Sequence, residues 1–180
     1  MSLADIARRA AGDPVKACQV FKAAAACADA ALARDPSRHD AAHWSGYWLD
    51  DAATAIQDTD PVEARLLYER AYEKFELALS IKPDKHEAAY NWGNSLHQLA
   101  RLAEKSDVGE ARRLYELACG KYELALSIKP DKHEAAYNWG NSLHQLARLA
   151  EKSDVGEARR LYELACGKYE LALSIKPDKH

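Results

Sequence analysis

The segment Lys82–Ser127, KPDKHEAAYNWGNSLHQLARLAEKSDVGEARRLYELACGKYELALS, decides the fold because the chain repeats it. The same letters return unchanged at Lys129–Ser174, an offset of 47 residues, and begin a third time at Lys176. Upstream copies have diverged but keep proline at one repeat position and glycine at another. These positions are Pro36, Pro83, Pro130 and Pro177, and Gly46, Gly93 and Gly140. The whole chain is therefore predicted to be an array of one structural unit.

The 47-residue offset divides the chain into units. Residues 1–35 are a partial unit, mostly its second half. Full units follow at 36–82, 83–129 and 130–176, and residues 177–180 start another. In such arrays each unit packs only on its neighbours. We expect one repeat domain over residues 1–180.

Each unit is predicted to contain two helices, which we call helix A and helix B. In the unit at 83–129, apolar and small residues recur at steps of three and four in both halves, the spacing of a helix buried on one face. The helix A stripe is Ala89, Trp92, Gly93, Leu96, Leu99, Ala100 and Ala103, and the helix B stripe is Ala111, Leu114, Tyr115, Ala118, Tyr122, Ala125 and Leu126. No strand signal interrupts them, so the fold class is all-α.

Capping residues are predicted at both helix starts. Asp84 with Glu87 has the spacing of a capping box for helix A, and Asp107 with Glu110 has it for helix B. Asp131/Glu134 repeat the first pair, and Ser37/Asp40 are its earlier version. Asp60-Pro61 adds a proline at the first helical position, where a missing N–H costs nothing.

The composition excludes several classes of function. The net charge of the 180 residues is −3, whereas a nucleic-acid binder needs a basic face. No window of 18 apolar residues exists and the first residues lack an apolar signal core, so we expect no membrane insertion and a cytoplasmic location. The cysteines show no CxxC spacing and are predicted to be buried and reduced. They are Cys18, Cys27, Cys119 and Cys166.

The pattern Ala89–x2–Trp92-Gly93–x2–Leu96, followed by Ala118, Tyr122, Ala125 and Pro130, resembles the tetratricopeptide repeat (TPR). The resemblance implies an α-solenoid of antiparallel helix pairs wound into a right-handed superhelix. It also implies that Gly93 lets the helices approach closely, with Tyr122 as the aromatic residue of helix B. Gly120 and Gly167, inside helix B, are expected to serve close packing as well.

The unit is longer than the standard TPR of about 34 residues. The extra residues add roughly two turns to each helix. Units of this length, with an IKPDKHEA-type linker, are similar to those of the plant mitochondrial outer-membrane import receptor of the twenty-kilodalton class. We expect no counterpart of that receptor's membrane anchor here and do not carry its function over from the sequence.

TPR proteins bind peptides in a concave groove lined by helix A, which implies a groove strip in each unit. The predicted partner-binding residues are Glu87, Tyr90, Asn94, His97, Gln98 and Arg101; Glu134, Tyr137, Asn141, His144, Gln145 and Arg148; and Asp40, His43, Tyr47, Asp50 and Asp51. Tyrosine offers contact area at low entropic cost, and asparagine pairs with a peptide backbone. A solvated helix face is the alternative. Lysine is missing where a carboxylate clamp needs it, and the acidic residues of the first set favour a basic segment.

Metal and catalytic chemistry are disfavoured. His39-Asp40-Ala41-Ala42-His43 has the spacing of a zincin motif with Asp for Glu. The later copy reads His86-Glu87-Ala88-Ala89-Tyr90, so the acidic residue is a repeat position of the helix start. His97 and His144 have no nucleophile and orienting acid at a suitable spacing. We therefore predict no enzyme, no metal and no cofactor.

The chain ends directly after a helix B, which predicts an apolar face open to a neighbour. Tyr162, Tyr169 and Leu173 are the residues expected to mediate end-to-end assembly. The identical copies indicate either a recent natural duplication or an engineered extension. The predicted function is a scaffold that binds a protein or peptide segment, and the alternative is a structural repeat that assembles through its ends, as a homo-oligomer.

Overall fold

The computed structural model describes residues 13–176, and all its regular elements are helices. In chain order they are α2 (Pro14–Arg34), α3 (His39–Ile56), α4 (Pro61–Ile81), α5 (His86–Ala103), α6 (Val108–Ile128), α7 (His133–Ala150) and α8 (Val155–Ile175). The predicted all-α solenoid of antiparallel helix pairs is confirmed. The expected N-terminal piece before Asp13 lies outside the described residues. None of the described helices is long and apolar enough to cross a membrane.

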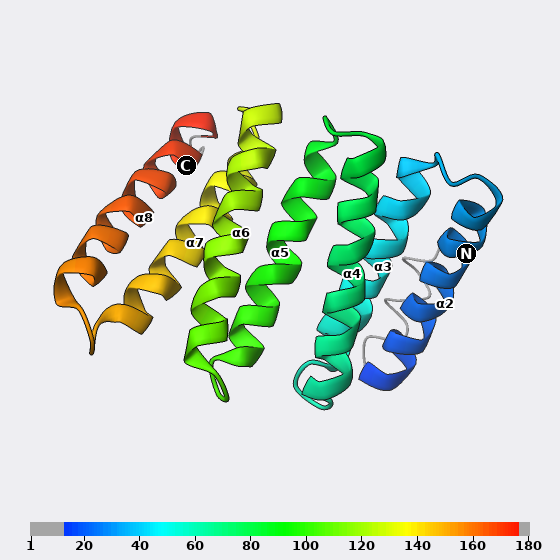
Figure 1. Ribbon diagram of the computed structural model, residues 1–180, viewed down its shortest axis with the longest axis horizontal. Helices are drawn as coiled ribbons and strands as arrows, with labels where there is room; N and C mark the ends of the chain where they lie inside the picture. The colour runs from blue at the N-terminus through cyan, green and yellow to red at the C-terminus, as the bar shows by residue number, and fades with distance from the viewer. Residues whose placement is uncertain (1–12, 177–180) are drawn as a thin grey trace. The chain divides into compact units, whose positions relative to one another are not determined.

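The chain divides into two compact units, Met1–Pro83 and Asp84–His180. In unit 1, α3 packs against both α2 and α4. In unit 2, α5 pairs with α6 and α7 pairs with α8, while α6 packs on α7 (Figure 1). Helices α3, α5 and α7 are the predicted A helices, and α2, α4, α6 and α8 are the B helices. One continuous repeat domain stays a prediction.

The conserved repeat glycine sets the closeness of each A–B pair. A Cβ atom on Gly93 would lie 2.6 Å from Cε1 of Tyr122, and one on Gly140 would lie 2.5 Å from the same atom of Tyr169. On Gly46 it would lie 2.8 Å from Phe75. The aromatic ring of helix B therefore occupies the space that any larger residue of helix A would need. The predicted role of this glycine is confirmed.

The other repeated glycine has a different role from the predicted one. A Cβ on Gly120 or on Gly167 would meet no atom within 4 Å. The expectation of close packing at these positions is wrong, because they lie on the open side of α6 and α8. A glycine there only weakens the helix.

The core consists mainly of alanine, leucine and tyrosine from the predicted stripes. Tyr68, Tyr115 and Tyr122 are fully or almost fully buried. Trp92 is only half-buried, with the Lys121 ammonium 3.3 Å from its ring centroid. Small residues at the helix crossings let large rings fill the space between paired helices.

Helix B begins as predicted, whereas helix A does not. Asp107 accepts a hydrogen bond of 2.9 Å from the backbone N–H of Glu110, and Asp60 does the same for Glu63 at 3.0 Å. The Glu110 carboxylate pairs with Arg113. These side-chain caps satisfy amides that the helix itself leaves unpaired.

The predicted caps Asp84, Asp131 and Ser37 of helix A are wrong. The N-cap residues are Lys85, Lys132 and Arg38, and none makes a side-chain capping bond. The proline and the residue after it, Pro83-Asp84 in α5's case, form a turn. The helix therefore starts one residue later than the capping-box spacing implied, and the carboxyl group of Asp84 precedes the cap.

The cysteines are free, as predicted, but they are not uniformly buried. Cys18 is buried and Cys119 half-buried, whereas Cys27 and Cys166 are exposed. The expectation of burial is wrong for the last two. Cys119 and Cys166 occupy the same repeat position, so the difference comes from what covers α6 and α8.

Candidate protein-binding site on the A helices

The A helices of unit 2 are joined by a polar network that starts in helix B. The Tyr122 hydroxyl donates to Oδ1 of Asn94 at 2.9 Å. Asn138 of α7 donates through its Nδ2 to the same oxygen at 3.0 Å and to the Tyr90 hydroxyl at 3.1 Å. Two predicted strip residues of α5, Tyr90 and Asn94, are thus joined to α7 through Asn138. The Asn94 NH2 group is the remaining donor of that side chain.

Asn138 is the residue that the sequence analysis missed. It follows Tyr137 directly and was not on the predicted strip, yet it links Tyr90 to Asn94. The signal was the pair of asparagines Asn138 and Asn141, which lie three residues apart on one helical face. Asn141 donates to Asn138 at 3.5 Å and accepts from the Tyr169 hydroxyl at 3.0 Å.

The strip on α7 is more open than the strip on α5. Tyr137 is 54% exposed, whereas its counterpart Tyr90 is half-buried. The Tyr137 ring lies 5.6 Å from that of Tyr169, centroid to centroid. An exposed tyrosine beside a row of asparagines offers a flat apolar face and amide groups together, which suits a peptide backbone and its side chains.

Charged and amide residues border this surface. Gln98 accepts from Arg101 at 3.0 Å, and Gln145 accepts from Arg148 at 2.9 Å. Arg148 also forms an ion pair with Glu104. At the other end of each helix, Glu87 lies near His86 and Glu134 near Lys132. Several of the predicted residues of α5 and α7 are therefore engaged in contacts inside the protein.

The two strip histidines have different surroundings. His97 is half-buried, accepts or donates a 2.8 Å hydrogen bond between its Nδ1 and the Ser142 hydroxyl, and meets the Tyr115 ring edge-on. Burial, with the nearby Arg101 charge, lowers the pKa of His97 to about 4. His144 is exposed. His97 therefore joins α5 to α7 and offers little surface to a partner.

In unit 1 the predicted strip contains one error. His43 is only 6% exposed, with its ring 5.9 Å from that of Phe75. It is a core residue beside α4, although the same repeat position holds the half-buried Tyr90 in α5 and the exposed Tyr137 in α7. Asp40 pairs with Arg38, which lowers the pKa of Asp40 to about 2. Burial raises the pKa of Asp51 to about 6.

Sequence analysis also missed an aromatic cluster around Tyr47. Trp44 is 49% exposed and lies against Tyr47 and Trp48, with centroid distances of 5.5 and 6.2 Å. Phe21 of α2 stacks on Trp48 at 5.9 Å. The signal was three aromatic residues within five positions, which exceeds what the core needs. Asp50 and Asp51 come two and three residues after Trp48 and are half-buried.

The residues predicted for end-to-end assembly do not share one environment. Tyr169 is turned into its own helix pair, where it contacts Gly140 and Asn141. Leu173 is 53% exposed. Tyr162 donates a 2.6 Å hydrogen bond to Glu151 and lines a pocket of about 510 Å³ on α8. Tyr162 and Leu173 are open to a partner, and Tyr169 is largely occupied.

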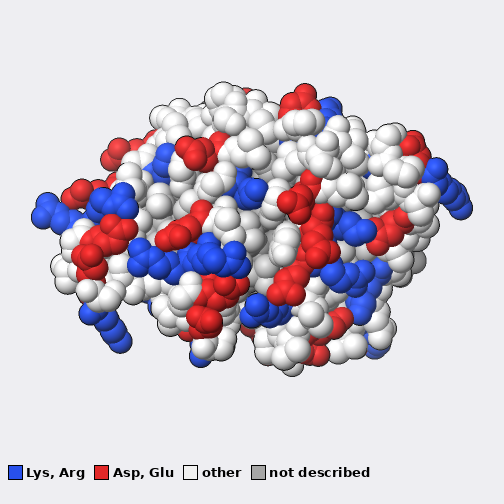
Figure 2. All heavy atoms as spheres, in the orientation of Figure 1, with Lys and Arg blue, Asp and Glu red and all other residues white. Residues whose placement is uncertain are grey.

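Charge and metal-ligand groups are distributed without a single focus. On the face drawn in Figure 2, basic and acidic side chains alternate across the surface. Among residues 13–176, no group of three or more His, Cys, Asp or Glu side chains is placed to hold a metal ion. His39 and His43 of the zincin-like motif do not form a metal site either, because His43 is buried in the core.

Comparisons with known proteins bear on the family. The model of the family described as "Plant specific mitochondrial import receptor subunit TOM20" matches residues 87–180. Two solved structures titled as MamA are similar, each with 17% identity and a TM-score of 0.37. They cover 97% and 94% of this chain and 90% and 92% of theirs. No curated protein sequence matches the chain.

Proposed function

Because this chain belongs to the plant-specific mitochondrial import receptor subunit TOM20 family, we propose that it is a receptor that binds a segment of a partner protein. The helical repeat fold is that of a protein-interaction scaffold. The family description makes a polypeptide destined for mitochondria the segment to expect. The proposed binding surface is the strip on α5 and α7, centred on Tyr137, Asn138 and Asn141.

The observation that carries this proposal is the exposure of Tyr137 beside the asparagine row. Because Tyr137 is 54% exposed, much of its apolar surface is still in contact with water. A bound segment would cover that area at about 25 cal/mol per Å². Hydrogen bonds inside the protein hold the neighbouring amides in place, so little side-chain entropy is lost on binding.

Glu87, Gln98, Arg101, Glu134, Gln145, Arg148 and His144 are proposed as the border of this surface. Tyr90 and Asn94 contribute its floor. In unit 1, Tyr47, Asp40, Asp50 and Asp51 remain a predicted strip of their own, with an acidic character. A cytoplasmic location stays a prediction.

Peptide binding tests the proposal. The probe is a labelled amphipathic peptide of about 20 residues, rich in Arg, Leu and Ser and free of acidic residues, the composition of transit peptides. Fluorescence anisotropy should show saturable binding. Tyr137→Ala should weaken the affinity about tenfold, which corresponds to about 1.4 kcal/mol.

The matched control is Leu171→Ala, which removes a 38% exposed side chain from α8, away from the strip. It should leave the affinity unchanged, and circular dichroism should show both variants folded. If Tyr137→Ala and Leu171→Ala bind the peptide like the unsubstituted chain, the strip is not the binding surface.

Self-assembly through the α8 end stays the alternative prediction, favoured by the exposure of Leu173. Sedimentation velocity over a hundredfold range of concentration measures it directly. A sedimentation coefficient that does not change with concentration would contradict assembly.

A further inference from the structure

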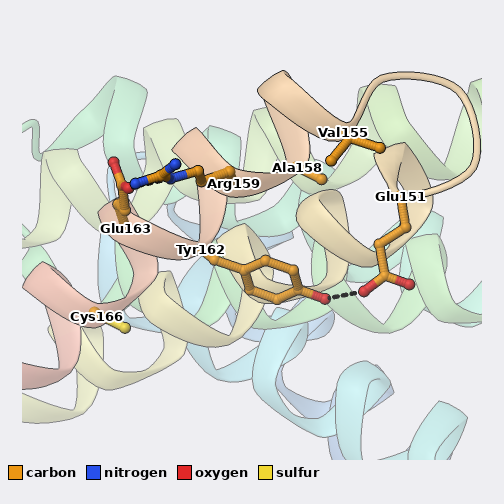
Figure 3. A pocket seen from close by; sticks show the side chains of 7 residues that line it. All are labelled: Glu151, Val155, Ala158, Arg159, Tyr162, Glu163 and Cys166. Carbon is orange, nitrogen blue, oxygen red and sulfur yellow. Dashed lines mark hydrogen bonds and ion pairs between the residues drawn. The ribbon is translucent and has the colours of Figure 1, made fainter.

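The helices α6 and α8 have the same 21-residue sequence but different neighbours. In unit 2, α7 packs on α6. The corresponding face of α8 holds the pocket of about 510 Å³, whose side chains Figure 3 shows. Because the two surfaces have the same residues, the contacts made on α6 indicate what the surface of α8 accepts.

Two contacts define how α7 lies on α6. Near one end, Arg148 pairs with Glu104, which also accepts a 2.6 Å hydrogen bond from the Tyr115 hydroxyl. Near the other end, the Trp139 side chain interacts with the Cys119 thiol. Trp139 and Arg148 are nine residues apart, or about 14 Å along a helix. Helix α7 therefore runs antiparallel to α6.

The same positions on α8 are open. Tyr115 is fully buried, whereas its counterpart Tyr162 is only half-buried. Arg112 has 45% of its side chain exposed and Arg159 has 82%. Burial raises the pKa of the Cys119 thiol to about 12, while Cys166 is exposed.

Along α8 the pocket has the same order of acidic, apolar and thiol groups as the covered surface of α6. Glu151 accepts the Tyr162 hydrogen bond, as Glu104 does from Tyr115 (Figure 3). Val155 and Ala158 lie between the acidic end and the Cys166 end. The geometry thus provides a carboxylate for an arginine, an apolar middle, and room for a large ring beside the thiol.

We propose that this face of α8 is a docking site for one amphipathic helix of a partner protein. That helix carries a large aromatic residue and, nine residues later, an arginine, as α7 does at Trp139 and Arg148. It lies antiparallel to α8, with its arginine on Glu151 and its ring beside Cys166. This surface is separate from the strip proposed for segment binding, and either can exist without the other.

A folded second copy does not supply the helix. In the described part of the chain, the tryptophan-bearing side of α7 already lies on α6, and Trp92, the equivalent residue of α5, is half-buried with the Lys121 ammonium 3.3 Å from its ring centroid. On α3, the repeat position of Trp139 is Ser45, which bonds Asp29 of α2 at 2.7 Å.

The probe is a capped synthetic peptide with the chain's own α7 sequence, residues 132–152. It is used at concentrations up to 1 mM, because a free helix must be ordered on binding and this weakens its affinity. Alkylation of Cys166 by a maleimide is the readout. Tryptic peptides around Cys119 and Cys166 are identical. Each thiol is therefore followed alone, in the variants Cys119→Ala and Cys166→Ala.

We expect the peptide to slow alkylation of Cys166 at least fivefold and to leave Cys27 and Cys119 unchanged. Peptides with Trp139→Ala or Arg148→Glu should lose this protection. Glu151→Arg in the chain should abolish protection by the unchanged peptide and restore it with the Arg148→Glu peptide. Rescue by the exchanged charges would show that residue 151 of the chain pairs with residue 148 of the peptide. Glu151 is exposed, so the chain stays folded after the substitution.

Three results would overturn the proposal: no protection at any concentration, equal protection of Cys166 and Cys27, or faster alkylation of Cys119, which would mean that the peptide displaces α7. Protection of Cys166 without peptide, together with a concentration-dependent dimer, would assign the face to a second copy instead. The Tyr137→Ala variant should keep full protection, so failure here is distinct from failure of segment binding.

Discussion

At the scale of single residues, each A–B pair depends on a glycine that faces an aromatic ring. Substituting Gly93 by Ala would place a Cβ 2.6 Å from Tyr122, so the ring or the helix must move. Overpacking of this kind costs about 1–3 kcal/mol. We expect Gly93→Ala to lower the free energy of unfolding in urea within that range.

Gly120→Ala provides the matched control in the same helix pair. Its Cβ meets nothing within 4 Å, and alanine is the better helix former by about 1 kcal/mol. This variant should be as stable as the unsubstituted chain or more so. Equal losses in the two variants would show that helix propensity, and not the fit against Tyr122, governs the position.

His97 predicts a dependence of stability on pH. Its pKa is lowered to about 4 in the folded chain, chiefly by burial and further by Arg101, while Glu104 opposes the shift. Between pH 6.5 and 4 the unfolded chain therefore takes up a proton that the folded chain refuses. The contribution of the neutral ring is complete above pH 6.5 and is lost as the pH falls toward 4.

We expect His97→Asn to lose less stability than the unsubstituted chain between pH 7.5 and 5.0, by on the order of 1 kcal/mol. Urea unfolding at the two pH values measures the difference. His144→Asn makes the same change at the same repeat position where the side chain is exposed, and it serves as the matched comparison. An unchanged pH dependence in His97→Asn would contradict the assignment.

At the scale of helices, the two helix types begin by different means. Asp107 caps α6 through a 2.9 Å bond to the Glu110 amide, whereas Asp84 precedes the Lys85 cap of α5 without such a bond. Removing a side-chain cap costs about 1 kcal/mol. Asp107→Ala should lower the stability by that amount, and Asp84→Ala should change it by less than about 0.5 kcal/mol. Thermal unfolding of both variants measures these two losses of stability. Similar losses would show that Asp84 does cap α5.

The helices and the helix B caps could be predicted because each depends on residues close in sequence or on the repeat period. The packing of Gly93 on Tyr122 followed from the TPR resemblance, whereas the open surroundings of Gly120 and Gly167 did not. The helix A cap could not, since the Pro83-Asp84 turn has the same spacing as a capping box. The burial of His43 and the exposure of Cys166 could not be predicted either. They depend on which helix covers the position, which an identical sequence such as that of α6 and α8 does not reveal.

At the scale of the molecule, the strip residues of α5 and α7 came from the TPR resemblance, and hydrogen bonds link three of those on α5, Tyr90, Asn94 and His97, to α7. Their division into floor and open surface follows from packing between repeats. Asn138 joins Tyr90 to Asn94, and Tyr137, at the repeat position of Tyr90, is 54% exposed. The same residue type at the same repeat position therefore differs in exposure between α5 and α7, and the residues of one repeat do not encode that difference.

The central claim is that this strip binds a segment of a partner protein. Photo-crosslinking tests it most directly, with benzoylphenylalanine placed either at Tyr137 or at Leu171 and the transit-type peptide as the target. We predict a peptide adduct from position 137 that unlabelled peptide suppresses, and no specific adduct from position 171. An adduct from position 171 alone, or from both positions equally, would contradict the account.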